Sequence, residues 1–474
     1  MLKNSVIISV FITVPAHALV NSVDNINTKY LEVMKNTDLV EHYSSEKIKD
    51  KILRKKVIIK YSQEAHQFGV TSIDTPFIVN GIENKKVDQA YFLLSKIGVD
   101  NVKSGAADWQ RIDDDKGGFT NLSDLNYQLA EAKKYGLSTS FIIGYPPRKY
   151  SNYGKSIRSA VKPEYLDKYN DYLKFIITYL KDYDVKYLEL ANEVDAPRHW
   201  WIRSSPEMYV HQMKILKEAI NKINPSLKTI AFSATYSRNE ALGGKEGGRR
   251  FIERCFQLGI DKFVDVYSYH HFSYWGDDNL PQYMEDVLKK HNIKKPIFNT
   301  EQLDTTQRQV HNSKPYNIIK VFAKGFFDYN APYIDYFMAR DAFVEQKVYP
   351  NGFTQGLFDI NWNPKPRLLA YAMAVDVMKD RELISHFVSK NSIEVYLLKN
   401  KKNNSPYKYS ALLWLNDNGH ARKTVSVNLS TIPLVETWDL DTYHKPNSFT
   451  LSQAPIALFS NSTIDIGKIV NGVK

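Results

Sequence analysis

The chain has 474 residues, of which 43% are hydrophobic and 24% are charged. This balance is typical of a globular protein that is long enough for more than one domain. The formal net charge of +11 favours acidic partners, but no zinc-finger spacing, RNA-recognition signature or basic region with heptads points to nucleic acid. The single cysteine, Cys255, excludes an intrachain disulfide.

The first 18 residues have the pattern of a signal peptide. Lys3 supplies a positive charge, residues 6–14 are mostly apolar, and Ala16-His17-Ala18 fits a cleavage site between small residues. The apolar stretch is too short to span a membrane stably. We therefore expect a secreted or periplasmic protein with no transmembrane segment in the mature chain.

From about residue 67 to residue 379, short apolar segments alternate with segments of helical length. The expected strands are 68–73, 99–103, 138–143, 187–191, 229–233, 264–269, 296–300 and 334–339. The expected helices are 87–97, 124–135, 165–180, 207–223, 249–258, 284–291, 318–328 and 366–378. Eight such repeats predict an α/β fold, a (β/α)8 TIM barrel. A doubly wound open sheet is the alternative, but no glycine-rich nucleotide loop follows the first strand.

The pattern changes on both sides of the predicted barrel. After residue 380, strand-like segments at 393–398, 409–414 and 423–428 alternate with polar turns. They predict a smaller C-terminal antiparallel β-sandwich domain over residues 380–474. Residues 19–66 form an N-terminal segment that we expect to be partly helical. Its apolar residues 57–59 are a possible strand that pairs with the β-domain.

Two of the apolar runs that predict strands end in a glutamate. Residues 188–193 read Leu-Glu-Leu-Ala-Asn-Glu, and residues 296–301 read Pro-Ile-Phe-Asn-Thr-Glu. Because the carboxyl ends of all strands of a parallel barrel meet at one mouth, we expect Glu193 and Glu301 to face each other there. Two facing carboxylates are the groups that cleave a glycosidic bond. Glu189 lies earlier in the same strand, and we expect it to be buried.

These motifs resemble those of clan A retaining glycoside hydrolases. Asn192-Glu193 after the fourth strand and Glu301 after the seventh match that pattern. Residues 99–103 with Asp108-Trp109 are similar to the second-strand region of the β-xylosidase-like family 39 and related exopolysaccharide-cleaving enzymes. Residues 135–137 and 364–366 are also similar to that group. The resemblance covers roughly residues 68–380 and implies a (β/α)8 barrel that hydrolyses glycosides.

The resemblance also implies roles for individual residues. Glu193 would be the acid/base and Glu301 the nucleophile, while Asn192 would hydrogen-bond the 2-hydroxyl of the sugar. A tyrosine hydroxyl of the sixth strand would touch the nucleophile, and a neighbouring histidine would line the mouth. The candidates for these two positions are Tyr267, Tyr269, His270 and His271.

Further candidates for substrate binding are aromatic and cationic residues near the strand ends. They are Trp200, Trp201, Trp275, Lys103 and Arg340. Tryptophans at a barrel rim stack on sugar rings, but they equally well cap the barrel. Lys103 stands where many clan members have an arginine, and Arg340 follows the eighth strand in a segment that lacks a tryptophan common in some families.

We expect no metal and no cofactor. His270 and His271 are adjacent in a strand, so their side chains face opposite sides and do not chelate one ion. No nucleotide loop and no Gly-x-Ser-x-Gly elbow occurs in the sequence.

The sequence thus predicts a secreted retaining glycoside hydrolase that cleaves a poly- or oligosaccharide by double displacement. The basic charge favours an acidic polymer, whereas the sugar, the linkage and internal or terminal cleavage stay open. The main alternative is a non-catalytic carbohydrate-binding or envelope adhesion protein on a barrel scaffold. A cationic structural protein of the envelope is a third possibility.

Overall fold

The computed structural model describes most of the chain from residue 44 onward. The described residues are 44–53, 66–73, 81–197, 199–235, 247–271, 280–303, 314–341, 354–401, 407–416, 425–428, 436–438, 443–444 and 448–471. The expected signal peptide and residues 57–59 therefore lie outside the described residues.

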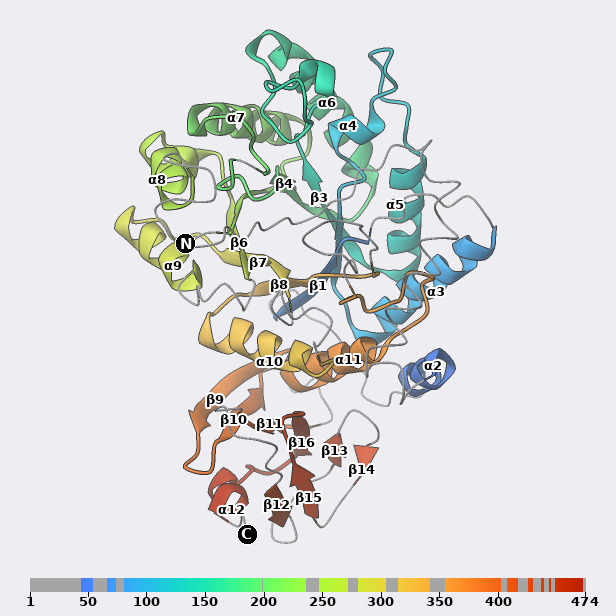
Figure 1. The fold of residues 1–474 in the computed structure, drawn as a ribbon, viewed down its shortest axis with the longest axis vertical. Helices are drawn as coiled ribbons and strands as arrows, with labels where there is room; N and C mark the ends of the chain where they lie inside the picture. The colour runs from blue at the N-terminus through green and yellow to red at the C-terminus, as the bar shows by residue number, and fades with distance from the viewer. Residues whose placement is uncertain are drawn as a thin grey trace, which may run out of the picture.

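Eight parallel strands form a closed barrel in sequence order, and this confirms the predicted TIM barrel (Figure 1). The strands are β1 (Gln67–Thr71), β2 (Asn101–Ser104), β3 (Ser138–Ile143), β4 (Val185–Leu190), β5 (Lys228–Ala234), β6 (Val266–His271), β7 (Ile297–Gln302) and β8 (Tyr333–Tyr336). Strand β1 pairs with both β2 and β8, which closes the sheet. The eighth strand is shorter than the 334–339 segment that the sequence predicts.

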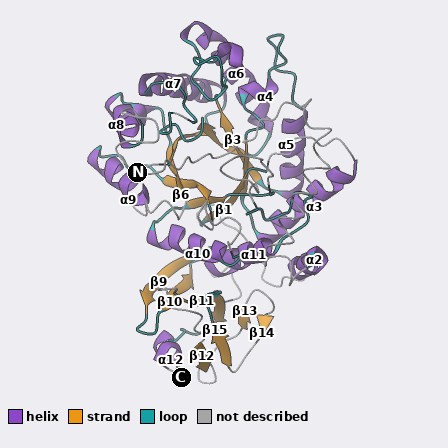
Figure 2. Cartoon of the chain, in the orientation of Figure 1, coloured by secondary structure: helices purple, strands orange, loops and turns teal. Residues whose placement is uncertain are grey.

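Helices surround the barrel, as Figure 2 shows. The main ones are α3 (Gly81–Ile97), α5 (Ser123–Tyr135), α6 (Leu166–Tyr179), α7 (Pro206–Ile223), α8 (Arg249–Gln257), α9 (Leu280–Lys290), α10 (Asn317–Ala323) and α11 (Pro366–Met378). Their apolar faces cover the outer surface of the strands. Helix α10 continues as a π-helical turn, Lys324–Asp328, so the segment predicted as one helix has two parts.

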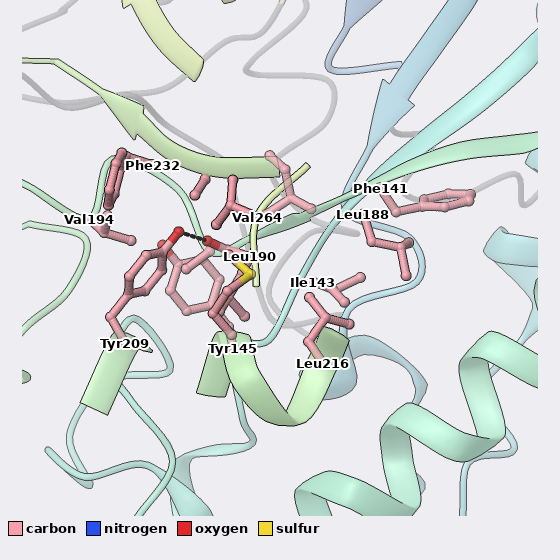
Figure 3. Packing of buried hydrophobic residues seen from close by; sticks show 14 of the residues in the cluster. Phe141, Ile143, Tyr145, Leu188, Leu190, Val194, Tyr209, Leu216, Phe232 and Val264 are labelled. Atoms are coloured by element: carbon pink, nitrogen blue, oxygen red, sulfur yellow. Dashed lines mark hydrogen bonds between the residues drawn. The ribbon is translucent and has the colours of Figure 1, made fainter. Parts of the chain in front are cut away.

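The outer face of β4 illustrates this packing (Figure 3). Leu188 and Leu190 lie in a buried apolar cluster with Leu216 and Tyr209 of α7. The Tyr209 hydroxyl donates a hydrogen bond to the Leu190 carbonyl oxygen over 3.2 Å. This contact fixes the end of the strand from which the first predicted catalytic residue follows.

The barrel interior has an apolar layer near the amino ends of the strands. Ile230, Val266, Phe298 and Tyr333 form a buried cluster there, and Tyr187 packs against it. Because these side chains fill the interior, the barrel is closed on that side. The site has to lie at the opposite, carboxyl end.

The C-terminal domain consists of two antiparallel sheets, in agreement with the predicted fold class. Its strands are β9 (Arg381–Val388), β10 (Ile393–Asn400), β11 (Tyr409–Leu415), β12 (Val425–Asn428), β13 (Glu436–Trp438), β14 (Tyr443–His444), β15 (Ser448–Leu451) and β16 (Ile456–Ser460). The larger sheet has the order β14-β13-β16-β11-β10-β9, and β12 pairs with β15. Both sheets contribute to one apolar core, and the short helix α12 (Ile466–Asn471) packs on it.

The β-domain is joined to the barrel through α11. Tyr396, Leu412 and Trp414 of the large sheet belong to the same apolar cluster as this helix. The Ser410 hydroxyl also donates to the Val377 carbonyl oxygen over 2.8 Å. In the N-terminal segment, α2 (Ser45–Leu53) buries Ile48 and Ile52 in that cluster.

Within the described residues, no helix combines the length and the apolar character that crossing a membrane requires.

Candidate active site

The turn after β4 aims Glu193 into the barrel mouth. Ala191 and Glu193 both adopt positive φ angles, 58° and 48°, which non-glycine residues rarely do. Tyr145 lies just after β3, and its hydroxyl holds this turn through two hydrogen bonds. It donates to the Asn192 carbonyl oxygen over 2.9 Å and accepts from the Asn192 backbone N–H over 2.8 Å. The strained backbone is therefore held by a buried neighbour, as is common at functional sites.

Replacing Tyr145 with phenylalanine removes both of these hydrogen bonds. We expect a loss of about 1–3 kcal/mol in the free energy of unfolding, because two backbone groups lose their partner. We also expect kcat/KM to fall roughly ten- to hundredfold, since displaced catalytic groups lose their alignment. Tyr371→Phe is the matched control. The hydroxyl of Tyr371 is also buried and donates to a backbone carbonyl oxygen, that of Gly69 in β1. Equal activity losses in both variants would contradict a positioning role for Tyr145.

His270 connects the two predicted catalytic carboxylates. Its Nδ1 lies 3.1 Å from Oε1 of Glu193 and 3.6 Å from Oε2 of Glu301. In the register of β6 and β7, His270 is the partner of Glu301, after a register shift. Glu193, His270 and Glu301 are all buried, and one polar atom of each lies within 4.8 Å of the others. The structure thus brings Glu193 and Glu301 together, as the sequence predicts.

Burial controls the charge of this group. It raises the pKa of Glu301 to about 8; the Lys103 ammonium opposes this shift, and the Glu189 and Asp335 carboxylates add to it. Burial, together with Lys103, holds the pKa of His270 well below its usual range. His270 is therefore a neutral imidazole at neutral pH.

A polar layer lies between the carboxylates and the apolar layer of the barrel. Lys103 of β2 donates to Oε2 of Glu189 over 2.9 Å and to the Thr300 carbonyl oxygen over 2.6 Å. The hydroxyls of three residues donate to Oε1 of Glu189, namely Ser233, Ser268 and Thr300. Burial would lower the pKa of Lys103, but Glu189, Asp335 and Glu301 outweigh it and raise that pKa. The cation lies next to the strand segment that holds Glu301, and it lowers the pKa of that carboxyl.

The side-chain amide of Asn192 is available to a ligand. Its Oδ1 and Nδ2 are buried, and neither makes a hydrogen bond with a described residue. A buried amide with open donor and acceptor positions is costly unless a bound molecule satisfies it. This arrangement agrees with the expected contact of Asn192 to a sugar hydroxyl.

Three residues predicted on strand six face away from the carboxylates. The Tyr267 ring packs against Phe232 and Phe256, between the strands and α8. Tyr269 and His271 lie on the same outer face, and the His271 ring is 5.3 Å from that of Tyr329. The expectation that the hydroxyl of Tyr267 or Tyr269 touches the nucleophile was wrong, because the inward positions of β6 are Val266, Ser268 and His270. Of the two histidine candidates for the mouth, His270 lies beside the carboxylates and His271 does not.

The remaining candidates are in different places. Trp200 lies beside Tyr145 with a ring-centroid distance of 6.3 Å, whereas buried Trp201 packs on Tyr209 of α7. Trp201 is thus a packing residue. Lys103 lies below the carboxylates and does not reach the mouth. Arg340 donates to the Ile360 carbonyl oxygen and stacks on Trp362, in the segment between β8 and α11. Trp275 lies outside the described residues.

Glu193, His270 and Glu301 also have the donor types and the spacing that suit a divalent cation. His271 does not belong to this set, in line with the argument that adjacent strand residues do not chelate one ion. The prediction of a metal-free enzyme stays a prediction.

Sequence reasoning missed Tyr145 and Arg158. Burial lowers the pKa of Arg158, and Tyr145 and Glu193 are the groups that raise it, so its guanidinium lies near the catalytic site. Both residues belong to the segment between β3 and α6. The pair Pro146-Pro147 after β3 marks an irregular loop at the mouth, and that was the available signal.

Structure comparison finds the same fold in several glycoside hydrolases. No protein-family model and no curated protein matches the sequence significantly. Among solved structures, a family 39 glycoside hydrolase from Bacteroides cellulosilyticus matches with a TM-score of 0.62 and 16% identity, over 83% of this chain and 80% of that chain. The chain has the fold of these enzymes.

Two further neighbours are similar over almost their whole length. A family 30 endoxylanase from Clostridium papyrosolvens matches with a TM-score of 0.54 and 16% identity, over 86% of this chain and 100% of that chain. A monomeric β-xylosidase from Caulobacter crescentus matches with a TM-score of 0.54 and 11% identity, over 85% and 97%. These neighbours agree with the clan A resemblance seen in the motifs. At identities this low, the structural similarity establishes a common fold.

Proposed function

We propose that the chain is a retaining glycoside hydrolase that cleaves a poly- or oligosaccharide. The observation that carries this proposal is the buried group of Glu193, His270 and Glu301, in which polar atoms lie within 4.8 Å of one another. In retaining enzymes the two carboxyl groups are about 5–5.5 Å apart, whereas inverting enzymes keep them roughly 6.5–9.5 Å apart. The fold, shared with glycoside hydrolases, supports the same assignment.

The first step forms a covalent ester. An ionised oxygen of Glu301 attacks the anomeric carbon while the glycosidic C–O bond breaks, and Glu193 gives its proton to the leaving oxygen. Asn192 holds the 2-hydroxyl of the sugar at this point. The Lys103 charge beneath Glu301 stabilises the ionised form of the nucleophile.

The second step releases the sugar. Glu193, now ionised, takes a proton from water, whose oxygen attacks the anomeric carbon and breaks the ester to Glu301. The freed Glu301 is ionised again and Glu193 is protonated, so the site returns to its starting state. His270 stays neutral and donates a hydrogen bond from Nδ1 that orients the carboxylates.

Export and an acidic substrate are further parts of the proposal. The amino-terminal pattern supports a secreted or periplasmic location, and the net charge of +11 supports attraction to an acidic polysaccharide.

Reducing-sugar release from a panel of neutral and acidic polysaccharides tests the activity. Proton NMR of the first product then tests retention, because the initial anomer has the configuration of the substrate. An initial product of opposite configuration would contradict the mechanism. Glycan binding without sugar release would favour the non-catalytic alternative.

A further inference from the structure

A pocket lies beside the catalytic carboxylates, among the segments that follow β2, β3 and β4. The residues around it leave about 370 Å³ of empty space, a volume that includes open solvent. The residues that line it are Gly105, Asp108, Gln110, Arg111, Ile142, Tyr145, Ile157, Arg158 and Trp200. Polar, apolar and aromatic groups are thus combined in one concave surface, as sugar binding requires.

Two guanidinium groups face this pocket. That of Arg158 lies over the Trp200 ring, 3.9 Å from the ring centroid, so its plane is held in place. The Arg111 group lies over Gly105, where a Cβ atom would be 3.8 Å from Nε of the arginine. Guanidinium groups that are held in a fixed orientation bind carboxylate and sulfate oxygens well, because their N–H groups match two oxygens at once.

The acidic residue of the pocket offsets these charges only in part. Oδ1 of buried Asp108 accepts hydrogen bonds from the backbone N–H groups of Trp109, over 3.0 Å, and Tyr145, over 2.9 Å. Burial raises the pKa of Asp108 to about 7, although these hydrogen bonds and Arg111 oppose the shift. The lining is therefore net positive at neutral pH.

The pocket adjoins the acid/base. Tyr145 lines the pocket and at the same time clamps the backbone of Asn192, the residue before Glu193. Arg158 interacts electrostatically with both Tyr145 and Glu193. A sugar substituent in the pocket would thus belong to a residue close to the bond that is cleaved.

On the basis of the proposed function, we propose that this pocket binds an anionic substituent of the substrate, a uronic carboxylate or a sulfate ester. Arg158 is the main specificity residue and Arg111 the second. This proposal makes an acidic polysaccharide the substrate class and assigns its recognition to the segments that follow β2 and β3.

The test compares each acidic polysaccharide with its own neutral derivative, prepared by carboxyl reduction or by desulfation. We expect wild-type kcat/KM to fall at least about tenfold on one of the two treatments, and that treatment identifies the anion. Arg158→Gln should lower kcat/KM on the acidic polymer by roughly ten- to hundredfold, the scale of a hydrogen bond to a charged group. It should also bring the ratio of acidic to neutral rates close to one, and Arg111→Gln should have the same effect to a smaller extent.

Lys155→Gln is the matched control, because it removes the same charge from an exposed residue of the same loop outside the pocket lining. It should leave the ratio unchanged. An equal change in Lys155→Gln, or wild-type cleavage of the neutral derivatives at an undiminished rate, would overturn the pocket assignment and leave the hydrolase proposal intact.

If wild type releases sugar from no polymer, the hydrolase proposal fails and the pocket is judged by binding. Affinity electrophoresis in gels that contain the acidic polymers would then compare wild type, Arg158→Gln and Lys155→Gln. Retardation that only Arg158→Gln loses supports the anion site. Equal retardation of all three, or none, contradicts it.

Discussion

Glu301→Gln should abolish turnover of any polysaccharide that the wild type cleaves. The amide has the shape of the carboxylate but cannot form the glycosyl ester, so we expect kcat to fall by roughly 10⁴-fold or more, the scale seen when a covalent nucleophile is removed. The fold should be retained, because Glu301 is a buried carboxyl whose charge burial already disfavours. Reducing-sugar release and thermal unfolding of both proteins measure the two effects.

Glu253→Gln is the control for this experiment, because Glu253 is a surface residue of α8 that pairs with Lys290 over 2.9 Å. It should retain wild-type activity. A Glu301→Gln protein that still released sugar at more than a few per cent of the wild-type rate would show that Glu301 is not the nucleophile.

Lys103→Met should have the largest effect on stability. It leaves the buried Glu189 carboxylate without its cation, and breaking a buried ion pair in this way costs about 3–5 kcal/mol. The double variant Lys103→Met with Glu189→Gln should recover much of this loss, because no uncompensated charge is left. Chemical denaturation of the single and double variants measures the coupling. Additive effects of the two substitutions would contradict the pairing.

The same substitution should shift the pH dependence of activity. Glu301 attacks only when it is ionised, so its protonation sets the acid limb of kcat/KM, near its pKa of about 8. Lys103 lowers this pKa, so its removal should raise the pKa and move the acid limb to higher pH. Lys365→Met breaks another buried pair, with Asp341 at 2.7 Å, and should destabilise the fold without moving the limb. An unmoved limb in Lys103→Met would contradict the electrostatic role.

The barrel and the proximity of Glu193 and Glu301 were predictable from the sequence for one physical reason. Strands buried on both faces appear as short apolar runs, and each run ends where the chain emerges at the carboxyl mouth. Glu193 and Glu301 interrupt such runs at their ends, so their meeting followed from topology alone. The distance between the two carboxylates and the position of His270 between them could be determined only from the structure.

The same burial explains the errors on strand six. When both faces of a strand are buried, hydrophobicity does not distinguish the inward residues from the outward ones. Tyr267 and Tyr269 were therefore as plausible as Ser268 and His270 for the inner face. The polar residues of β6 were the better signal, because burying Ser268 and His270 requires partners that the barrel interior supplies in Glu189 and Glu193.

The contact between Arg158 and Trp200 that shapes the pocket could not be predicted from the sequence. Arg158 and Trp200 belong to different loops, and their stacking arises only when the segments after β3 and β4 lie side by side. Loop conformation depends on such tertiary contacts more than on local pattern. The predicted role of Trp200 at the barrel rim agrees with its place in this pocket.

Trapping the covalent intermediate tests the central proposal most directly. Glu193→Ala removes the base that activates water, so a substrate with a good leaving group should form the glycosyl ester faster than it is hydrolysed. Mass spectrometry of tryptic peptides should then find the added sugar on the peptide that contains residues 295–308, at Glu301. A label at Asp304 in the same peptide, or no label while sugar is still released, would contradict a retaining mechanism through Glu301.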